Sequence, residues 1–172
     1  LIFNQRSIEE ILEVILTIGR IVSAEEKAQK LVDNYKKRLN SLREKSDKIQ
    51  NKPKVYFEEW DNPTFSGIRW VSELIEIAGG EDIFANKSHG KLAMEREIQW
   101  SDVIEKNPDV ILASWCGKPV DIDSIKKREG WNEITAIKNN RIHEIDSSII
   151  LQPGPACLTD GLKVLEQLIS NR

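Results

Sequence analysis

The sequence lacks the features that mark several classes of protein. Its 172 residues include two cysteines, Cys116 and Cys157, too few for a disulfide-rich scaffold or for a zinc site of their own. No run of 18 apolar residues occurs, so the pattern predicts no membrane-spanning helix. The net charge of −3 offers no basic field for nucleic acid. With 40% hydrophobic and 31% charged residues, the composition is typical of a globular protein with one core.

Catalytic motifs are missing as well. Gly79-Gly80 follows a predicted helix rather than a strand, so the dinucleotide-binding fingerprint is absent. Cys116 and His143 do not suggest a nucleophile and its base, because His143 falls in the middle of a predicted strand. Glu58 and Glu59 are adjacent on a strand and should point to opposite faces, which argues against a paired-carboxylate site. A metal site made by the histidines and Cys116 would need three separate segments to converge, so we expect none.

The longest regular feature is a helix expected from Ser23 to about Ile49. Ser23-Ala24-Glu25-Glu26 has the pattern of a capping box, in which the serine hydroxyl accepts from the N–H of Glu26. The helix would be roughly 40 Å long and would end before Pro53. Its apolar stripe consists of Ala28, Leu31, Tyr35, Leu39 and Leu42. A coiled-coil arm is the alternative, but the stripe is short for that structure, and we favour a spine that connects two bodies.

The rest of the chain predicts an α/β fold. Leu1–Phe3 has the pattern of the tail of a strand, and Ser7 opens a helix to Gly19 with a second capping box. We expect strands at 55–60, 109–114 and 141–146, and helices at 68–78, from a Ser101 cap to before Pro108, in pieces over 121–136, and from about Pro155 onward. Residues 81–96 should be rich in loops. This alternation predicts a parallel, Rossmann-like sheet with helices on both faces, preceded by the long helix.

Ligands of such sheets bind beyond the carboxyl ends of the strands, which selects a short set of residues. Trp60 and Trp115 follow two strands that should be neighbours, so we expect both indoles in one cleft at that edge. Indoles at such positions form flat apolar walls with a polar edge; the alternative is that each merely covers the end of the sheet. The candidate ligand-binding residues are Glu59, Trp60, Asn62, Trp115, Cys116 and Gln152.

These stretches resemble the substrate-binding proteins of ABC importers for vitamin B12, haem and iron chelates, and most of all the cobalamin-binding branch. The resemblance rests on VYFEEWDNPTFSGIRWVSELIEIAGGEDIF (Val55–Phe84), NPDVILASWCGKP (Asn107–Pro119), REGWNEITAIKNNRIHEID (Arg128–Asp146) and LQPGPACLTDGL (Leu151–Leu162). Segments such as GGEDIF are common in the superfamily, whereas EEWDNP, SWCG and QPGP are more restrictive. In this family one rigid helix joins two lobes.

The resemblance implies a domain organisation. Residues 1–22 would be the end of an N-terminal lobe with a connecting helix, residues 23–50 the linker helix, and residues 51–172 the C-terminal ligand-binding lobe. A chain that begins inside an apolar run then looks like a fragment that binds its ligand weakly by itself. The protein would be extracytoplasmic, in the periplasm or as a cell-surface lipoprotein, with its signal sequence outside this chain.

The resemblance also implies a function without catalysis or an intrinsic cofactor: capture of cobalamin or another corrinoid for delivery to an ABC permease. Trp60 and Trp115 would pack against the faces of the ligand. Glu59, Asn62 and Gln152 would form hydrogen bonds with its amide edges. Three alternatives remain open, namely an iron–siderophore or haem-binding protein of the same family, an enzyme domain of similar architecture, and an interaction module or lobe without a ligand.

Two positions depart from the family pattern. Ser101 stands where members carry a glutamate that docks on the permease, so any docking role falls to the neighbouring Asp102. Ala156 stands where many relatives have arginine.

Two further expectations concern the cysteines and the assembly. Neither cysteine should bind metal, and a disulfide is chemically permitted outside the cytoplasm if Cys116 and Cys157 face each other. The apolar surface of the first fifty residues predicts pairing with a second copy, as a homodimer.

Overall fold

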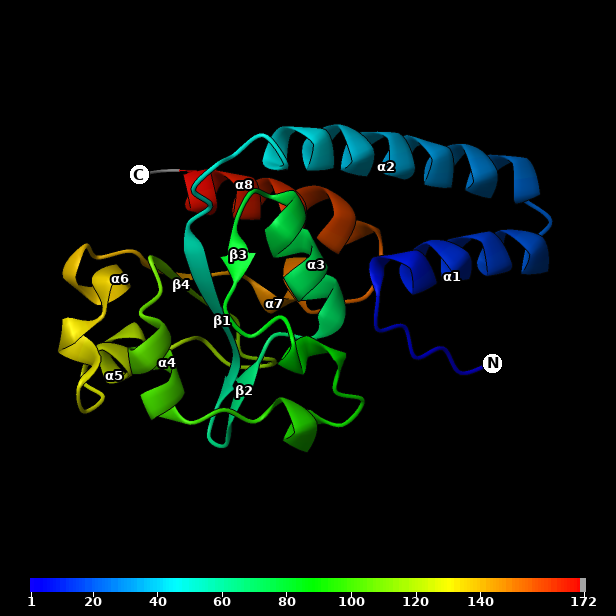
Figure 1. The fold of residues 1–172 in the computed structure, drawn as a ribbon. Coiled ribbons are helices and arrows are strands. Elements are labelled where there is room, and N and C mark those ends of the chain that lie inside the picture. The colour runs from blue at the N-terminus through cyan, green and yellow to red at the C-terminus, as the bar shows by residue number, and fades with distance from the viewer. Residues whose placement is uncertain (171–172) are drawn as a thin grey trace.

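A five-stranded sheet runs through the protein in the computed structural model, which describes residues 1–170 (Figure 1). The strand order is β2-β1-β4-β5, with β3 beside the start of β1. β3, β4 and β5 join the sheet in parallel, and β2 is antiparallel to β1. The strands are β1 (Lys54–Asp61), β2 (Thr64–Ser66), β3 (Glu81–Asp82), β4 (Val110–Ala113) and β5 (Ile142–Glu144). The predicted parallel α/β sheet is therefore confirmed.

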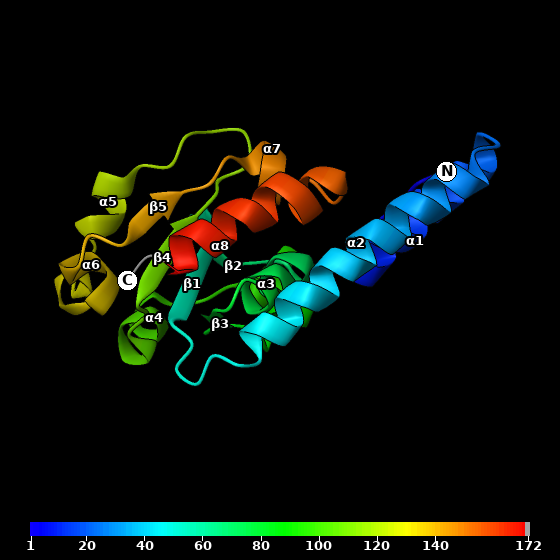
Figure 2. The same cartoon turned by 90° about the horizontal axis from the view of Figure 1, so that it is seen from above.

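Helices cover both faces of the sheet, as predicted (Figure 2). The α-helices are α1 (Ile8–Ile21), α2 (Glu25–Ser46), α3 (Arg69–Ile77), α4 (Trp100–Lys106), α5 (Ile122–Lys126), α6 (Thr135–Lys138), α7 (Ser147–Ile150) and α8 (Leu162–Ser170). Short 3₁₀ turns are η1 (Lys87–His89), η2 (Ala93–Arg96) and η3 (Trp131–Glu133), and η4 (Cys157–Gly161) is a π-helical turn. Among residues 1–170, no helix is long and apolar enough to cross a lipid bilayer.

Side chains along β1 alternate between two separate cores. Val55 and Phe57 pack into the core made with α1, α2, α3 and α8. Tyr56 packs into the second core, with residues of α4, α5, η3 and α6. β4 alternates in the same way, so its run VILA is buried on both faces. A strand covered on both sides can be apolar throughout, which is why this one was easily predicted.

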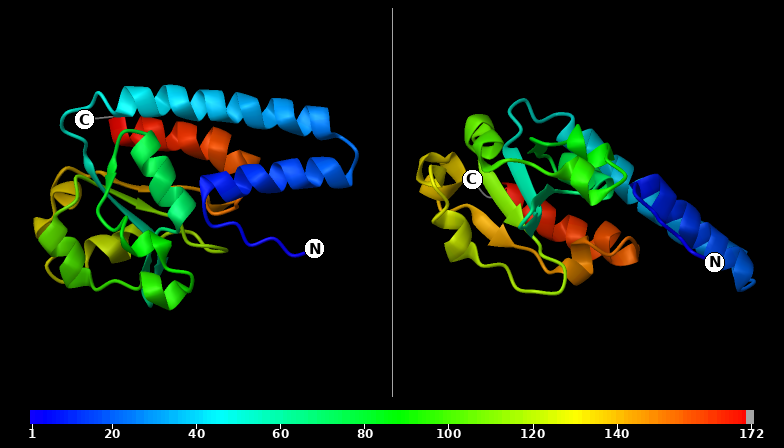
Figure 3. Two further views of the ribbon diagram at one scale, coloured as in Figure 1. Left: turned by 45° about the vertical axis from the view of Figure 1, so that its right-hand side comes forward. Right: turned by 90° about the horizontal axis from the view of Figure 1, so that it is seen from below.

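The helices α1 and α2 form an antiparallel hairpin along one side of the sheet (Figures 1 and 3). The capping box predicted for α1 is confirmed, since Ser7 Oγ accepts from the Glu10 N–H at 3.2 Å and the Glu10 carboxylate accepts from the Ser7 N–H at 3.2 Å. The predicted long helix is confirmed as the 22-residue α2. The turn of the hairpin extends away from the sheet (Figure 2). Exposed apolar side chains lie in this turn and in the adjoining parts of both helices, namely Ile18 and Ile21 of α1, Val22 of the turn and Leu31 of α2.

Two details of the long helix differ from the prediction. The capping box at Ser23 is wrong, because Ser23 adopts a left-handed φ of 53° and Ala24 is the N-cap, without a side-chain hydrogen bond. The close approach of α1 and α2 demands this tight turn, since a Cβ at Gly19 would lie 2.4 Å from the Ala28 Cβ. Leu31 of the predicted stripe is exposed and Val32 is buried instead. Packing against α1 and α3, not the helix pattern alone, selects the buried face.

Other local predictions are also corrected. Leu1–Phe3 is not a strand. Ser101 does not cap α4; the N-cap is Gln99, whose N–H donates to the Asp102 carboxylate at 3.3 Å. The sequence did not predict β2, β3 or α7, because elements of 3, 2 and 4 residues show too little periodicity. The broken helical pieces on both sides of Gly130 are confirmed as α5, η3 and α6.

The last helix begins at Pro155, as predicted, and passes through the π-helical turn η4 before it continues as α8. Gly161 closes this turn against the backbone of the segment that follows β5. A Cβ at this position would lie 2.3 Å from the carbonyl oxygen of Ile149. A side chain is therefore excluded by backbone rather than by a flexible neighbour.

We predict that Gly161→Ala lowers the free energy of unfolding by about 1–3 kcal/mol, the usual effect of overpacking a buried site. Gly154→Ala is the matched control, because no atom lies within 4 Å of the Cβ it would add. That control should change the stability by less than about 0.5 kcal/mol. Urea denaturation of both variants measures the difference, and equal stabilities would contradict the steric account.

Candidate functional site

Trp60 and Trp115 lie close together at the carboxyl edge of the sheet, as predicted, whereas the cleft that they were expected to share stays a prediction. The Lys118 Nζ lies 4.4 Å from the ring centroid of Trp60 and 4.7 Å from that of Trp115. The same ammonium donates to both carboxylate oxygens of Asp61, at 2.9 and 3.0 Å. One positive charge is therefore held by two indoles and a carboxylate. We call Trp60, Asp61, Trp115 and Lys118 the indole cluster.

Hydrogen bonds fix the orientation of both indoles. The Trp60 Nε1–H donates to the carbonyl of Asn62 at 3.2 Å, and the Trp115 Nε1–H donates to Glu58 Oε1 at 3.2 Å. Trp115 is 4% exposed and belongs to the second core, whereas Trp60 is only half-buried. Trp115 thus covers the end of the sheet, the alternative left open by the sequence, while Trp60 also presents surface to solvent.

A buried ion pair supports the indole cluster. Arg128 donates to both carboxylate oxygens of Glu58, at 2.5 and 2.9 Å. Glu58 is fully buried and the Arg128 side chain is 5% exposed. The hydroxyl of Tyr56 donates to Glu58 at 2.9 Å, and burial raises the pKa of Tyr56 well above its usual value, so that the phenol stays protonated. The sequence analysis did not find this pair, because Arg128 lies 70 residues further along the chain.

Two more tryptophans enclose the guanidinium of Arg128. Its Cζ lies 4.8 Å from the ring centroid of Trp100 and 4.5 Å from that of Trp131. The Trp100 Nε1–H donates to the Thr64 hydroxyl at 3.0 Å, which ties α4 to β2. Cation–π contacts of this kind contribute more when the cation is removed from water. The guanidinium of Arg128 is therefore held by the Glu58 carboxylate and by the two indoles together.

Glu59 points to the other face of β1, as predicted, and meets a different arginine. Arg96 donates to both of its carboxylate oxygens, at 2.7 and 2.8 Å, and the Ile68 N–H donates to Oε2 at 3.0 Å. Glu58 and Glu59 therefore point apart, and each is paired with an arginine of its own. The predicted contact of Glu59 with a ligand stays a prediction, since its carboxylate already binds these three donors.

A surface hollow of about 350 Å³ adjoins the indole cluster through Asp61. It lies between the β1–β2 turn and the start of α4, and it is lined by Asp61, Asn62, Pro63, Thr64, Glu97, Ile98, Gln99, Trp100 and Ser101. Ser101 lines this hollow, next to Asp102, the residue predicted for permease docking. The carboxylate of Asp102 instead accepts the N–H of Gln99 in the first turn of α4.

The remaining candidate residues lie in separate places. Cys116 is exposed beyond β4, and Gln152 is exposed in the turn between α7 and the last helix. Cys157 is buried, and its thiol donates to the carbonyl of Gly154 at 3.1 Å. Burial raises the pKa of Cys157 to about 11, so this thiol is protonated and unreactive at neutral pH. Both cysteines are free, and the permitted disulfide is not formed.

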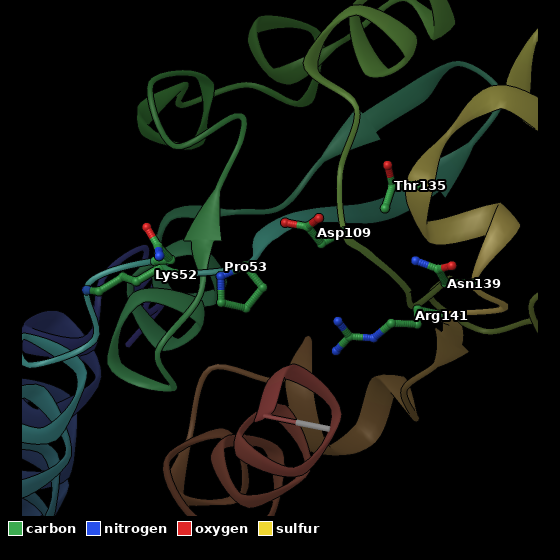
Figure 4. A pocket seen from close by; sticks show the side chains of 7 residues that line it. Lys52, Pro53, Asp109, Thr135, Asn139 and Arg141 are labelled. Carbon is green, nitrogen blue, oxygen red and sulfur yellow. The ribbon is translucent and has the colours of Figure 1, made fainter. Parts of the chain in front are cut away.

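Two other locations were considered for the candidate site, a metal-binding group and the amino end of the sheet. Within residues 1–170, no three His, Cys, Asp or Glu side chains form a group that could hold a metal ion. A hollow of about 280 Å³ at the amino ends of β1, β4 and β5 is lined by Asn51, Lys52, Pro53, Asp109, Thr135, Asn139 and Arg141 (Figure 4). Its Arg141 donates to the carbonyls of Leu168 and Ile169 at the end of α8. Ligands of parallel sheets bind at the carboxyl edge, so we assign the candidate site to the indole cluster.

We predict that Arg128→Met lowers the free energy of unfolding by about 3–5 kcal/mol, because it leaves the fully buried carboxylate of Glu58 without its cation. The double variant Glu58→Met/Arg128→Met removes both charges and should be more stable than the single variant. Urea denaturation checks both values. A single variant as stable as the original chain would contradict the burial of an ionised pair.

The sequence is similar to proteins of one known family. The sequence profile of the periplasmic binding protein family matches residues 1–149. A Bacillus subtilis protein named as an uncharacterized ABC transporter substrate-binding lipoprotein is 27% identical over 171 residues, which cover 96% of this chain and 52% of that protein. A vitamin B12-binding protein of Vibrio parahaemolyticus is 25% identical, over 95% of this chain and 58% of its own length. The chain therefore spans little more than half the length of these relatives.

Solved structures show the same fold. A Staphylococcus epidermidis protein described as a possible iron-binding, periplasmic solute-binding protein aligns with a TM-score of 0.80 and 26% identity, over 98% of this chain and 64% of the other. An S. aureus protein complexed with haem aligns with a TM-score of 0.79 and 19% identity, over 98% and 67% of the two chains, and shows the fold alone. From the family match over most of its length, the chain belongs to the periplasmic binding protein family.

Proposed function

We propose that this chain is the ligand-binding lobe of the substrate-binding component of an ABC importer, and that it captures cobalamin or another corrinoid for delivery to a permease. The observation that carries the proposal is the indole cluster at the carboxyl edge of the sheet, in a chain of the periplasmic binding protein family. The relatives named above are transport proteins, which supports a role in binding rather than catalysis. The lipoprotein name of one relative supports a location outside the cytoplasmic membrane.

The residues divide into those that would contact the ligand and those that hold them. Trp60 would lie against an apolar face of the macrocycle, because its indole is half-buried and fixed by a hydrogen bond. Asn62, Cys116 and Gln152 are exposed and would meet the polar amide edges. Trp115 is buried and would act mainly as the floor of the site. Glu59 would accept a hydrogen bond from the ligand only through an oxygen lone pair that Arg96 does not occupy.

Delivery requires a surface that the permease recognises. We propose the hollow beside α4 for that role, because Ser101 opens on it where family members carry a docking glutamate. Asp102 would contribute little, since its carboxylate is held by the first turn of α4.

A second candidate function is binding of an iron chelate or haem. The similarity to the S. epidermidis structure described as possibly iron-binding favours it. Both candidates use the same edge of the sheet, so the test must compare ligands directly.

We predict that cyanocobalamin quenches the tryptophan fluorescence of this chain in a saturable manner, because the indole of Trp60 would lie against the macrocycle. Trp60→Ala should weaken the affinity about tenfold or more, as truncation of an aromatic anchor costs on the order of 1–3 kcal/mol. Isothermal titration calorimetry, which does not depend on the removed fluorophore, measures the difference.

Met94→Ala is the control, because it removes an exposed apolar side chain that belongs neither to the indole cluster nor to the α1–α2 hairpin. Haemin and a ferric siderophore are titrated in parallel. Tighter binding of either would favour the second candidate, and no binding of any of the three would refute the proposed function.

We also infer that the chain pairs with a second copy through its first fifty residues. The end of the hairpin exposes Ile18 and Ile21 of α1, Val22 of the turn and Leu31 of α2, with Val22 at 62%. A twofold axis would bury the same patch on both copies. We predict a concentration-dependent dimer in sedimentation equilibrium and its loss in Ile21→Lys/Val22→Lys. A monomer at all micromolar concentrations would contradict this inference.

A further inference from the structure

The ammonium of Lys118 lies against the two indoles that the proposed ligand would contact. It lies over the faces of both indoles, and its ion pair with Asp61 is bidentate. The side chains remain partly open to solvent, Lys118 at 40% and Asp61 at 28%. Two aromatic faces with a carboxylate are the arrangement by which proteins recognise organic cations. Here the cation belongs to the protein itself.

We propose that Trp60, Trp115 and Asp61 form a cation cage that Lys118 fills when no ligand is bound. The incoming ligand displaces Lys118 and presents positive charge to the cage, as an organic ammonium group or as the face of a cationic metal macrocycle. This inference rests on the proposed function and names the ligand class that the same site selects.

Electrostatics gives the cage its selectivity. The face of an indole carries the negative part of the ring quadrupole, so both rings attract positive charge and repel anions. With the ammonium in place the cluster is neutral, because Lys118 balances Asp61. Once Lys118 leaves, the cage carries the uncompensated charge of Asp61. The cobalt(III)–corrin unit of cyanocobalamin is formally cationic, with the balancing negative charge on the phosphodiester of its nucleotide loop, whereas a ferric tricatecholate is strongly anionic.

The segment that carries Lys118 can move at little cost. Residues 116–119 are exposed, and the backbone N–H of Lys118 reaches the carbonyl of Trp115 only at a long 3.5 Å. Gly117 has a φ of +81°, and no atom would lie within 4 Å of a Cβ there. Displacement of Lys118 therefore breaks its ion pair and its cation–π contacts but disturbs no packed core.

An internal ammonium competes with every external one. Because Lys118 is tethered next to the cage, it acts at a high effective concentration. Removal of its charge should therefore strengthen the binding of an external cation. A lysine that bound an anionic group of the ligand would show the opposite behaviour on truncation, so the direction of the change decides between the two roles.

The test titrates tetramethylammonium into the whole chain and follows tryptophan fluorescence. Lys118→Ala should bind this probe about tenfold more tightly than the original chain, given the effective concentration of the tethered ammonium. Lys118→Met, which keeps the length of the side chain, is the second variant. Asp61→Asn in the Lys118→Ala background should abolish the gain. Lys127→Ala, which removes an exposed lysine outside the cluster, should leave the response unchanged.

Failure of both folded Lys118 variants to bind tetramethylammonium more tightly would overturn the proposal. A gain that survives Asp61→Asn would overturn it too, since the probe would then bind elsewhere. Cyanocobalamin is titrated in the same samples. A cage that accepts tetramethylammonium while no variant binds a corrinoid, haemin or siderophore would refute the proposed function but not the cage. Tighter binding of a ferric tricatecholate than of cyanocobalamin would refute the cationic selectivity.

Discussion

The buried pair of Glu58 and Arg128 is the interaction on which the candidate site depends. It joins β1 to the segment that follows α5, and its carboxylate also accepts from Tyr56 and from the Trp115 indole. A charge removed from water this completely is tolerated only with such a set of donors. The pair fixes the orientation of Trp115, and Trp115 in turn supplies one face of the cage around Lys118. The position of Trp115 beside Lys118 at the surface therefore depends on the buried ion pair beneath it.

The two ends of the sheet have different characters because different groups occupy them. At the amino ends, Arg141 donates to the carbonyls of Leu168 and Ile169, so its positive charge stabilises the C-terminus of α8. At the carboxyl ends, aromatic and charged side chains from β1 and from the loop after β4 converge on one point. In the described part of the chain, this edge combines the two indoles with the Lys118 ammonium, the Asp61 carboxylate and exposed polar groups. These are the elements that recognise a large amphipathic ligand.

The α1–α2 hairpin packs against the core of the sheet at one end and projects from it at the other. Its inner side chains, such as Ile11 and Val32, share the core of the sheet, so the hairpin is an integral part of the described fold. The end of the hairpin that carries Val22 projects beyond the sheet and exposes apolar side chains. The chain spans little more than half the length of its relatives. Surface of this kind is a natural place for contact with a further body of protein.

The sequence by itself determined the class of fold and the edge of the sheet that matters. β4 was predicted correctly because burial on both faces makes it continuously apolar. The start of α1 was predicted correctly because its capping box is a local sequence pattern. Trp60 and Trp115 could be placed together because parallel neighbouring strands end at one edge. Local pattern failed where tertiary contacts prevailed, as at Ser23, where the close packing of α1 and α2 overrides a capping box.

Only the tertiary structure decided the partners of the charged residues. Arg128 and Lys118 look like ordinary surface residues in the sequence, yet one is buried against Glu58 and the other lies between two indoles. Their partners are 70 and 57 residues away, and no local periodicity encodes such a separation. The sequence therefore identified the aromatic residues of the site, whereas the ion pairs that hold and fill it follow from how distant segments meet in the fold.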